Sequence, residues 1–541
     1  MSKFRQYLKK AVENVISHGD TDIFPFPIEN ILFKDKKTET IDLLEIIHKN
    51  FDSYLTEYPL LHERSLQAVG YYGFRYGTQL DPFWNAYLLA QVIAISDDIE
   101  KARVPLSRNK VYSYRYNYDK EKHSLFDKEY NWSAFNKRAT ELARDYKVVL
   151  KCDISNFYPS VYHHRIENAL KKASSNTESI SRTLKILTKI SKGVSYGLPV
   201  GGPAARILSE LLLNRTDRLL LSEGIEYCRY ADDYIIFSNS VEEAYGQLIF
   251  ISEKLHENEG LAIQKSKTQI MSSKEFLALS EFGDTSEKSE SDEQEFNFLK
   301  LRLFYDPYSP TANEDYEELT SELYKFDIVG MLVNEINKSR INQALTRRLI
   351  NSIKYLNNTQ KKAAVYSIFS NNEDKKSNLD ILYPVFPSVM ILTRAIISEL
   401  DDETKEMVFS ELRRLLRNDS YITQVPVNLS YAVRILAQDK SEESDFVLSK
   451  AFKEEDNPII RADIILAMAQ KDCDFWVSDK LKSYGSLSRW EKRSLLIASY
   501  ILKDEGEHWR TKVKKELPEV DLLLLDWFSG RFSNNDWGVV L

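Results

Sequence analysis

Cysteine and histidine are scarce in this sequence. Its 541 residues include three cysteines and eight histidines. Cys152, Cys228 and Cys473 are widely separated and do not have the spacing of a metal-ligand cluster. The histidines are too few and too scattered for a nuclease or protease signature. We therefore expect reduced thiols and a cytoplasmic protein.

Long hydrophobic runs are also missing. The longest apolar runs are much shorter than a membrane span, and the first residues, Met1 to Arg5, lack the apolar core of a signal peptide. We therefore expect no membrane partner. The hydrophobic content of 43% is sufficient for sizeable cores, and a chain of this length predicts two to four domains.

Charge is unevenly distributed along the chain. The net charge of −8 argues against a protein covered by nucleic acid. Residues 101–150 nevertheless contain 12 Lys and Arg against 6 Asp and Glu, which suits contacts to phosphates, although a merely basic surface would have the same composition. Residues 281–295 contain 7 acidic residues and one lysine, and we predict a mobile insertion from about 280 to 295.

Two acidic sites follow apolar segments. In the stretch 230–234, Asp232 and Asp233 lie between apolar residues, which predicts a strand, a tight turn and a second strand. Upstream, the apolar run 148–152 ends at Asp153. Two strands that each end in a carboxylate can lie side by side and hold a pair of divalent metal ions. We therefore predict that these three aspartates are catalytic metal ligands; an ordinary solvated turn is the alternative for the Asp-Asp pair alone.

Three segments resemble the reverse transcriptases. Residues 150–160 resemble the first palm motif of that family, residues 230–233 resemble its Tyr-x-Asp-Asp hairpin, and residues 197–213 resemble its Gly/Pro loop that opens a helix. The three occur in the order of the family. The resemblance implies a right-hand polymerase with fingers and palm, which uses dNTPs and two Mg²⁺ ions, with Mn²⁺ as an alternative.

The resemblance also implies residues that contact the substrate. Tyr158 lies where reverse transcriptases place an aromatic ring under the sugar, which selects dNTPs; packing in the core is the alternative. Gly197, Pro199 and Gly201 would shape a loop that the template or nucleotide approaches closely. Val200 stands where retroviral-type enzymes usually carry glutamine, which departs from ordinary template positioning.

Two basic residues are further candidates. Residues 111–118 alternate strictly and predict a strand of the fingers, with Arg115 a candidate contact for the incoming triphosphate. Lys267 lies in a segment that resembles the end of the palm, where a lysine could assist the departing pyrophosphate. A plain strand surface and a solvated lysine, respectively, are the alternatives. Residues 296–303 resemble the primer grip, but Lys300 stands where glycine is usual.

The fold class we expect is α+β. We predict an N-terminal helical segment and fingers in 1–140, a palm in 141–305, and an all-α, HEAT-like solenoid in 306–541, because helical apolar spacing dominates the last part. A single compact helical bundle is the alternative for that part.

The chain most resembles the defence-associated, abortive-infection reverse transcriptases of bacteria. This resemblance rests on residues 18–25, on the loop 197–201 with the following segment 206–211, and on the helical C-terminal half. It implies antiphage defence, DNA synthesis that is untemplated, protein-primed or programmed by a noncoding RNA, a single-stranded DNA product, and homo-oligomers. Conventional RNA-templated cDNA synthesis of the retron or intron type is one alternative. An inactive palm scaffold whose helical domain binds a protein is the other.

Overall fold

The computed structural model describes residues 3–21, 23–281, 298, 319–370 and 377–534. The chain divides into two compact units. The first unit contains residues 1–22, 26–64 and 77–285, and the second contains residues 23–25, 65–76 and 286–541. Residues of both predicted domains, 1–140 and 141–305, thus contribute to the first unit.

A buried helix, α5 (Pro82–Ala102), forms the centre of the N-terminal part of the first unit. Asp81 caps α5, because its carboxylate accepts hydrogen bonds from the backbone of Phe83 (3.0 Å) and Trp84 (3.4 Å). Pro82 occupies the first turn, where no intrahelical donor is needed. The helices that pack most extensively on α5 are α1 (Lys3–His18), α9 (Thr177–Ile190) and α10 (Pro203–Ser222). The remaining helices of this part are α2 (Glu29–Asp35), α3 (Lys37–Lys49), α4 (Phe51–Glu57), α7 (Phe157–Ser160) and α8 (His163–Ala173).

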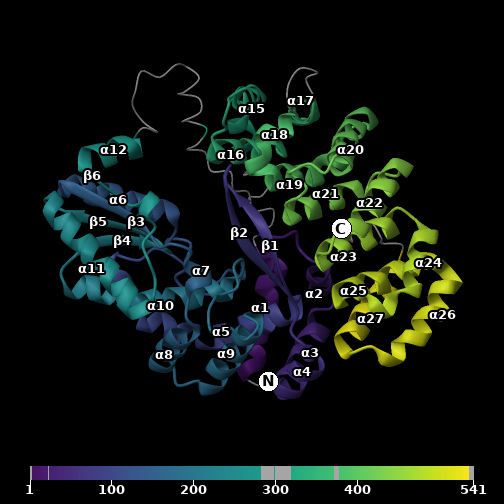
Figure 1. Ribbon diagram of the computed structural model, residues 1–541, viewed down its shortest axis with the longest axis horizontal. Helices are drawn as coiled ribbons and strands as arrows, with labels where there is room; N and C mark the ends of the chain where they lie inside the picture. Colours follow the sequence, from purple (N-terminus) through teal and green to yellow (C-terminus); the bar gives the residue numbers. More distant parts are fainter. Residues whose placement is uncertain (1–2, 22, 282–297, 299–318, 371–376, 535–541) are drawn as a thin grey trace. The chain divides into compact units, whose positions relative to one another are not determined.

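Four antiparallel strands form the sheet of the first unit, in the order β4-β5-β3-β6. They are β3 (Val148–Asp153), β4 (Glu226–Tyr230), β5 (Asp233–Ser238) and β6 (Gln269–Ser272). Helices α6 (Trp132–Asp145) and α12 (Ser273–Glu281) pack on one side of the sheet, and α10 and α11 (Val241–Glu259) pack on the other (Figure 1). The strands that we predicted around the aspartates are confirmed.

A β-hairpin interrupts the N-terminal helices, and the sequence did not predict it. Its strands are β1 (His62–Val69) and β2 (Gly73–Leu80). The predicted strand over residues 111–118 is wrong. This segment forms only isolated bridges, Val111 to Arg229 and Tyr116 to Phe126, because Tyr114 adopts a left-handed backbone conformation (φ 45°) that breaks the extended chain.

The described part of the second unit is mostly helical beyond residue 318. Alternate helices pack on one another: α19 on α21, α21 on α23 and α23 on α25, while α17 packs on α20 and α20 on α22. The helices are α15 (Ile328–Ile336), α16 (Gln343–Ile353), α17 (Asn358–Phe369), α18 (Asn378–Leu382), α19 (Phe386–Ile396), α20 (Asp402–Arg417), α21 (Pro426–Leu436), α22 (Glu442–Glu454), α23 (Pro458–Gln470), α24 (Asp474–Lys482), α25 (Arg489–Ala498), α26 (Lys503–Val513) and α27 (Glu519–Ser533). The predicted acidic insertion beyond α12 and, apart from Phe298, the predicted primer grip lie outside the described residues.

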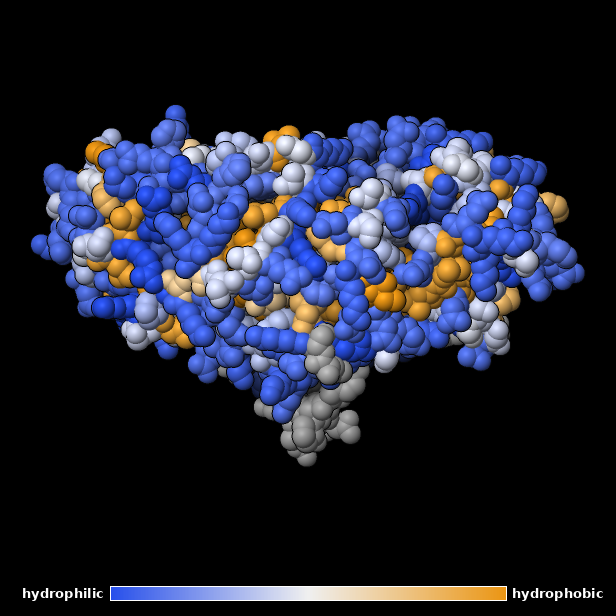
Figure 2. All heavy atoms as spheres, turned by 90° about the horizontal axis from the view of Figure 1, so that it is seen from below, coloured by the Kyte–Doolittle hydropathy of each residue, from blue (hydrophilic) through white to orange (hydrophobic). Residues whose placement is uncertain are grey.

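Among the residues that the structure describes, one helical stretch, Asn378–Glu399, is long and apolar enough to cross a membrane by length and composition alone. However, 61% of its apolar window is buried inside the protein, as in the core helices of many folded domains. Hydrophilic side chains cover most of the face drawn in Figure 2, and smaller apolar patches lie between them. Within the stretch 378–399, α19 packs against α16 and α21.

Candidate active site

The antiparallel pair β3–β5 brings the three predicted aspartates to one end of the sheet. Asp153 is the last residue of β3 and lies directly opposite Asp233, the first residue of β5. Side chains directly opposite each other in an antiparallel pair point to the same face. Asp232 lies in the turn before β5, and its carbonyl accepts a hydrogen bond from the backbone of Ile154 (3.2 Å). Carboxylates from two distant parts of the chain thus become neighbours.

Negative charge is concentrated where these carboxylates meet. Burial and the charge of Asp153 raise the pKa of Asp232 to about 7, and the same two causes raise the pKa of Asp233. Lys267 forms an ion pair with Oδ2 of Asp153, and this hydrogen bond raises the pKa of the lysine. The charges of Lys267 and Lys151 thus offset those of the three carboxyl groups only in part, an arrangement that a further cation would stabilise.

The donor set fits a divalent cation. Asp153 is 5% exposed, and its Oδ1 atom is buried without a hydrogen-bond partner. Carboxylate oxygens are the ligands that hard divalent cations prefer. Within the described ranges, no three His, Cys, Asp or Glu side chains already converge as a metal cage, and Asp153 instead points one oxygen at Lys267. The residues that would hold a cation are Asp153, Asp232 and Asp233.

The turn that carries Asp232 is strained and is held from beneath. Only two residues, Ala231 and Asp232, connect β4 to β5, and Ala231 adopts a left-handed conformation (φ 51°) that a residue with a Cβ atom rarely occupies. Arg229 donates a hydrogen bond to the carbonyl of Ala231 (2.8 Å). This contact fixes the strained backbone immediately before the Asp-Asp pair.

Arg229 is itself fixed by two carboxylates of α10. Its guanidinium is 0% exposed and donates to both oxygens of Asp217 (2.9 and 2.7 Å) and to both oxygens of Glu210 (3.2 and 2.9 Å). Glu210 also accepts from Arg103 (2.5 Å) and Ser113 (2.6 Å). Burial lowers the pKa of Arg229, but the two carboxylates outweigh burial and raise that pKa well above its usual value. We call Arg229, Glu210 and Asp217 the buried triad.

The sequence contains a signal for the buried triad that our sequence reasoning did not use. Arg229 interrupts the apolar strand β4, and Glu210 and Asp217 stand seven residues apart, on one face of α10. Charges at such positions are buried only when they are paired. A charged residue in a core strand and two acids at helical spacing therefore predict an internal ion-pair network.

Arg115 is placed differently from the sequence-based prediction. Its guanidinium is 2% exposed and donates to Glu100 (2.9 Å) and to the carbonyls of Val111 (3.0 Å) and Val104 (2.8 Å). An arginine engaged in this way supports the fold and does not present its side chain to a triphosphate. The proposed triphosphate contact of Arg115 is therefore corrected.

Tyr158 and the Gly/Pro loop lie together. The backbone of Leu198 donates to the carbonyl of Tyr158 (2.9 Å). Gly197 (φ 100°) and Gly201 (φ 127°) have backbone conformations that side chains rarely allow, so glycine is required at both positions. Pro199 is buried between them. Burial raises the pKa of Tyr158, which keeps its hydroxyl neutral beside Tyr114 and Ser209.

Asp20 lies beside this loop. Asp20 is 1% exposed, and its carboxylate accepts hydrogen bonds from Gln79 (2.7 Å) and Asn30 (3.2 Å). The next residue back along β2, Thr78, donates its backbone N–H to the carbonyl of Val200 (3.1 Å). A Cβ atom at Gly202 would lie 3.5 Å from the carbonyl oxygen of Asp20. Asp20, one residue of the segment whose resemblance we noted, is thus linked to the loop through β2 and lies close to Gly202.

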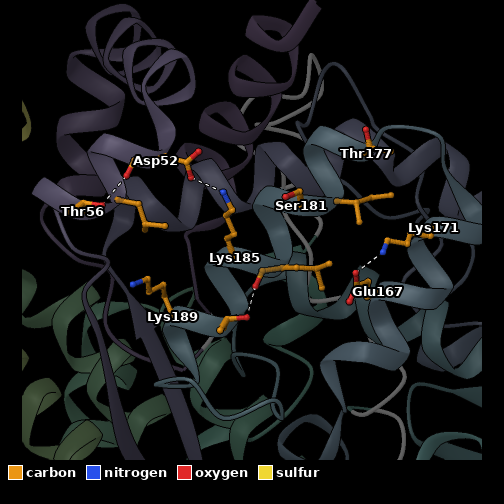
Figure 3. Close-up of a pocket in the computed structure, with 12 residues that line it drawn as sticks. Asp52, Thr56, Glu167, Lys171, Thr177, Ser181, Lys185 and Lys189 are labelled. Carbon is orange, nitrogen blue, oxygen red and sulfur yellow. Dashed lines mark hydrogen bonds and ion pairs between the residues drawn. The ribbon is translucent and has the colours of Figure 1, made fainter.

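A cavity of about 760 Å³ lies between α4, α8 and α9 (Figure 3). Apolar side chains line part of it, and two ion pairs lie beside it, Lys185 with Asp52 (2.7 Å) and Lys171 with Glu167 (2.6 Å). None of the predicted site residues lines this cavity, so it is separate from the aspartates.

Comparison with known proteins identifies the class of the first unit. Residues 98–303 match the profile of the family described as "Reverse transcriptase (RNA-dependent DNA polymerase)". This part of the chain is therefore similar to a reverse transcriptase domain, the domain that carries catalysis in RNA-directed DNA polymerases. Domains of this family generally depend on divalent metal ions and use nucleotide substrates and RNA templates.

More specific similarities are limited in extent. The chain is 29% identical to the retron Mx65 reverse transcriptase of Myxococcus xanthus over 142 residues, which is 23% of this chain and about a third (33%) of that relative. A structure of telomerase from Candida albicans, with a fragment of telomeric RNA, aligns over 72% of this chain and 70% of its own, with 10% identity and a TM-score of 0.31. The structure of apo telomerase from Candida tropicalis aligns over 77% of this chain and 73% of its own, with 10% identity and a TM-score of 0.29. Scores this low do not establish a shared fold.

Proposed function

We propose that this protein is a DNA polymerase that adds dNTPs at the site formed by Asp153, Asp232 and Asp233, with two Mg²⁺ ions. The observation that supports this most directly is the pairing of Asp153 with Asp233 at the end of β3–β5, beside Asp232 and with one oxygen of Asp153 unsatisfied. When bound, divalent ions activate the attacking hydroxyl and neutralise charge on the leaving pyrophosphate.

The protein's own side chains would do the rest. Asp153 and Asp233 would hold cations at a position set by strand register, and the turn residue Asp232 would complete the set. Lys267, which already faces Asp153, is available to the charge that develops on a departing pyrophosphate. Tyr158 and the loop from Gly197 to Gly201 would line the nucleotide site.

The test is dNTP incorporation by the double variant Asp232→Ala/Asp233→Ala. We expect incorporation to be abolished while the circular dichroism spectrum remains that of the parent. Glu253→Ala/Glu257→Ala is the matched control, because it also removes two carboxylates of the same unit but on the exposed face of α11. Synthesis that persists in the aspartate variant would reject the metal assignment.

We further propose that the protein acts in antiphage defence, in the cytoplasm, as a homo-oligomer, and that its DNA synthesis is untemplated, protein-primed or programmed by a noncoding RNA. The resemblance of residues 18–25 and 197–211 to abortive-infection enzymes supports this, and so does the helical second unit. The packing of alternate helices, α19 to α25 in one row and α17 to α22 in another, suits a HEAT-like solenoid.

A second candidate is RNA-templated cDNA synthesis of the retron type, and the similarity to a retron enzyme favours it. The sequence of the product distinguishes the two functions. A faithful copy of a supplied RNA of mixed sequence would support the retron type. A product of biased composition, unrelated to any supplied RNA, would support untemplated synthesis.

A further inference from the structure

The tip of the β1–β2 hairpin presents an aromatic surface that the proposed active site does not use. We define the hairpin tip as residues 65–76, which belong to the second unit. Tyr72, Phe74 and Tyr76 occupy alternate positions there and are 81%, 55% and 58% exposed. Phe74 and Tyr76 lie at alternate positions of β2, so their side chains point to the same face, and Tyr72 lies in the turn immediately before β2. We call these three rings the aromatic stripe. Single exposed aromatics are ordinary, but adjacent ones mark an interaction site.

The hairpin tip is held in place by the second unit. The Tyr71 hydroxyl accepts a hydrogen bond from the backbone of Ile341 (2.7 Å), and the Ser65 hydroxyl accepts one from Asn457 (2.7 Å). Arg340 donates to the Tyr72 hydroxyl (3.1 Å) and lies 5.3 Å from the centre of that ring. The stripe is therefore positioned before any ligand arrives, which reduces the entropy that binding would lose.

The charge around the stripe favours a polyanion. Residues 65–76 include Arg75 and no Asp or Glu, although the chain as a whole has a net charge of −8. Arg75 points away from the rings, toward Gln67 (2.8 Å), and Arg340 lies beside Tyr72. Exposed flat rings with neighbouring arginines, and without carboxylates, are the combination by which proteins bind single-stranded nucleic acid.

We propose that the aromatic stripe of Tyr72, Phe74 and Tyr76 binds single-stranded nucleic acid by stacking unpaired bases on its rings. This inference rests on the proposed function, because a DNA polymerase of this class handles single strands as template or product. Side chains at alternate strand positions lie about 7 Å apart, so the rings of Phe74 and Tyr76 each take a separate base and do not form one continuous stack. Because every base has a flat face, the stripe discriminates little between sequences.

The test measures binding and not synthesis. A fluorescein-labelled single-stranded oligonucleotide of mixed sequence is titrated with the full-length protein in EDTA, and its fluorescence anisotropy is recorded. Each stacking ring contributes roughly 5- to 150-fold to affinity, so Tyr72→Ala/Phe74→Ala/Tyr76→Ala should weaken binding by at least about tenfold. Phe475→Ala is the matched control, because Phe475 is an aromatic residue of the second unit that is 95% exposed and lies outside the stripe.

One further variant separates stacking from hydrogen bonding by a tyrosine hydroxyl. Tyr76→Phe keeps the ring and removes its hydroxyl, so it should bind like the parent. The stripe variant must also retain the parent's circular dichroism spectrum and melting temperature. Affinity that is unchanged in the stripe variant overturns the proposal. A loss of self-association in that variant, with unchanged nucleic-acid affinity, also overturns it and makes the stripe a contact between copies of the chain.

The same measurement in Asp232→Ala/Asp233→Ala keeps this proposal distinct from the proposed function. Suppose that the parent synthesises no DNA under any condition, while the aspartate variant still binds the oligonucleotide through the stripe. The proposed polymerase function then fails, and the proposed binding site stands. If the parent synthesises DNA but the stripe variant binds normally, the site fails and the function stands.

Discussion

Replacing Arg229 by methionine should destabilise the sheet that carries the aspartates. The substitution keeps roughly the volume of the side chain but removes its positive charge. The buried carboxylate of Asp217 then has no cation beside it, and the buried carboxylate of Glu210 loses its two hydrogen bonds from Arg229. Breaking a buried ion pair on one side costs about 3–5 kcal/mol. Single domains have a free energy of unfolding of about 5–15 kcal/mol, so this loss is a large fraction of the total. The strained turn at Ala231 also loses its hydrogen bond, and dNTP incorporation should fall with it.

The assay is native-state hydrogen exchange, because it reports the stability of each unit separately in a chain of two units. Amides of β4 and β5 should exchange faster in Arg229→Met. In Arg229→Met/Asp217→Leu, where both charges are gone, part of the loss should be recovered. Equal exchange in the parent and the single variant, or no recovery in the double variant, would refute the reasoning.

Arg493 offers a matched control for this experiment. It is also a buried arginine, 2% exposed, and it donates to Asp521 at 3.0 Å within the second unit. Arg493→Met should accelerate exchange in α25 and α27 and leave β4 and β5 unchanged. A general effect of losing a buried arginine would instead appear in both units.

Three other perturbations have defined outcomes. Burial raises the pKa of Glu259 to about 7, so the folded state loses stability from this group as the pH rises from about 4.5 through about 7. Glu259→Gln should flatten this part of the curve of unfolding free energy against pH, by at most about 3 kcal/mol. An unchanged slope would contradict this. Gly197→Ala should lower the urea midpoint of unfolding, because the unfolding free energy falls by about 1–3 kcal/mol. Gly246→Ala, in the middle of α11 where a Cβ atom meets no neighbour, should raise the midpoint through a gain of about 0.5–1 kcal/mol. Similar shifts at both sites would show that the left-handed backbone of Gly197 is not the cause. Lys267→Met removes the ammonium group that pairs with Asp153 and would compete there with a metal ion. Added Mg²⁺ should therefore raise the melting temperature of this variant more than that of the parent. An equal rise would exclude competition between the lysine and the metal.

The sequence predicted the part of the site that depends on strand ends. An apolar run that ends in Asp153, and an Asp-Asp turn between two apolar runs, define β3, the hairpin and their common edge, because strand pairing follows from local pattern and from the short turn. The mostly helical C-terminal region was predicted for the same reason, since helical periodicity is a local property.

The prediction failed where long-range contacts decide the local structure. The tyrosines of 111–118 alternate as in a strand, but Arg103 and Glu100 bind the backbone of this segment at Tyr114 and Tyr116 and hold it in an irregular path. Arg115 is buried by the same contacts, which no periodicity reveals. The hairpin of β1 and β2 was missed because its exposed aromatic tip lacks the apolar alternation of a half-buried strand.

The pairing of Asp153 with Asp233 has a consequence for how the site can vary. The pairing of β3 with β5 can shift only by whole residues. A shift of one residue would turn Asp153 to the opposite side of the sheet. A single inserted or deleted residue within β3 should therefore be intolerable, however conservative its chemistry. Adaptation to an ion of another radius is left to rotation of the carboxyl groups themselves.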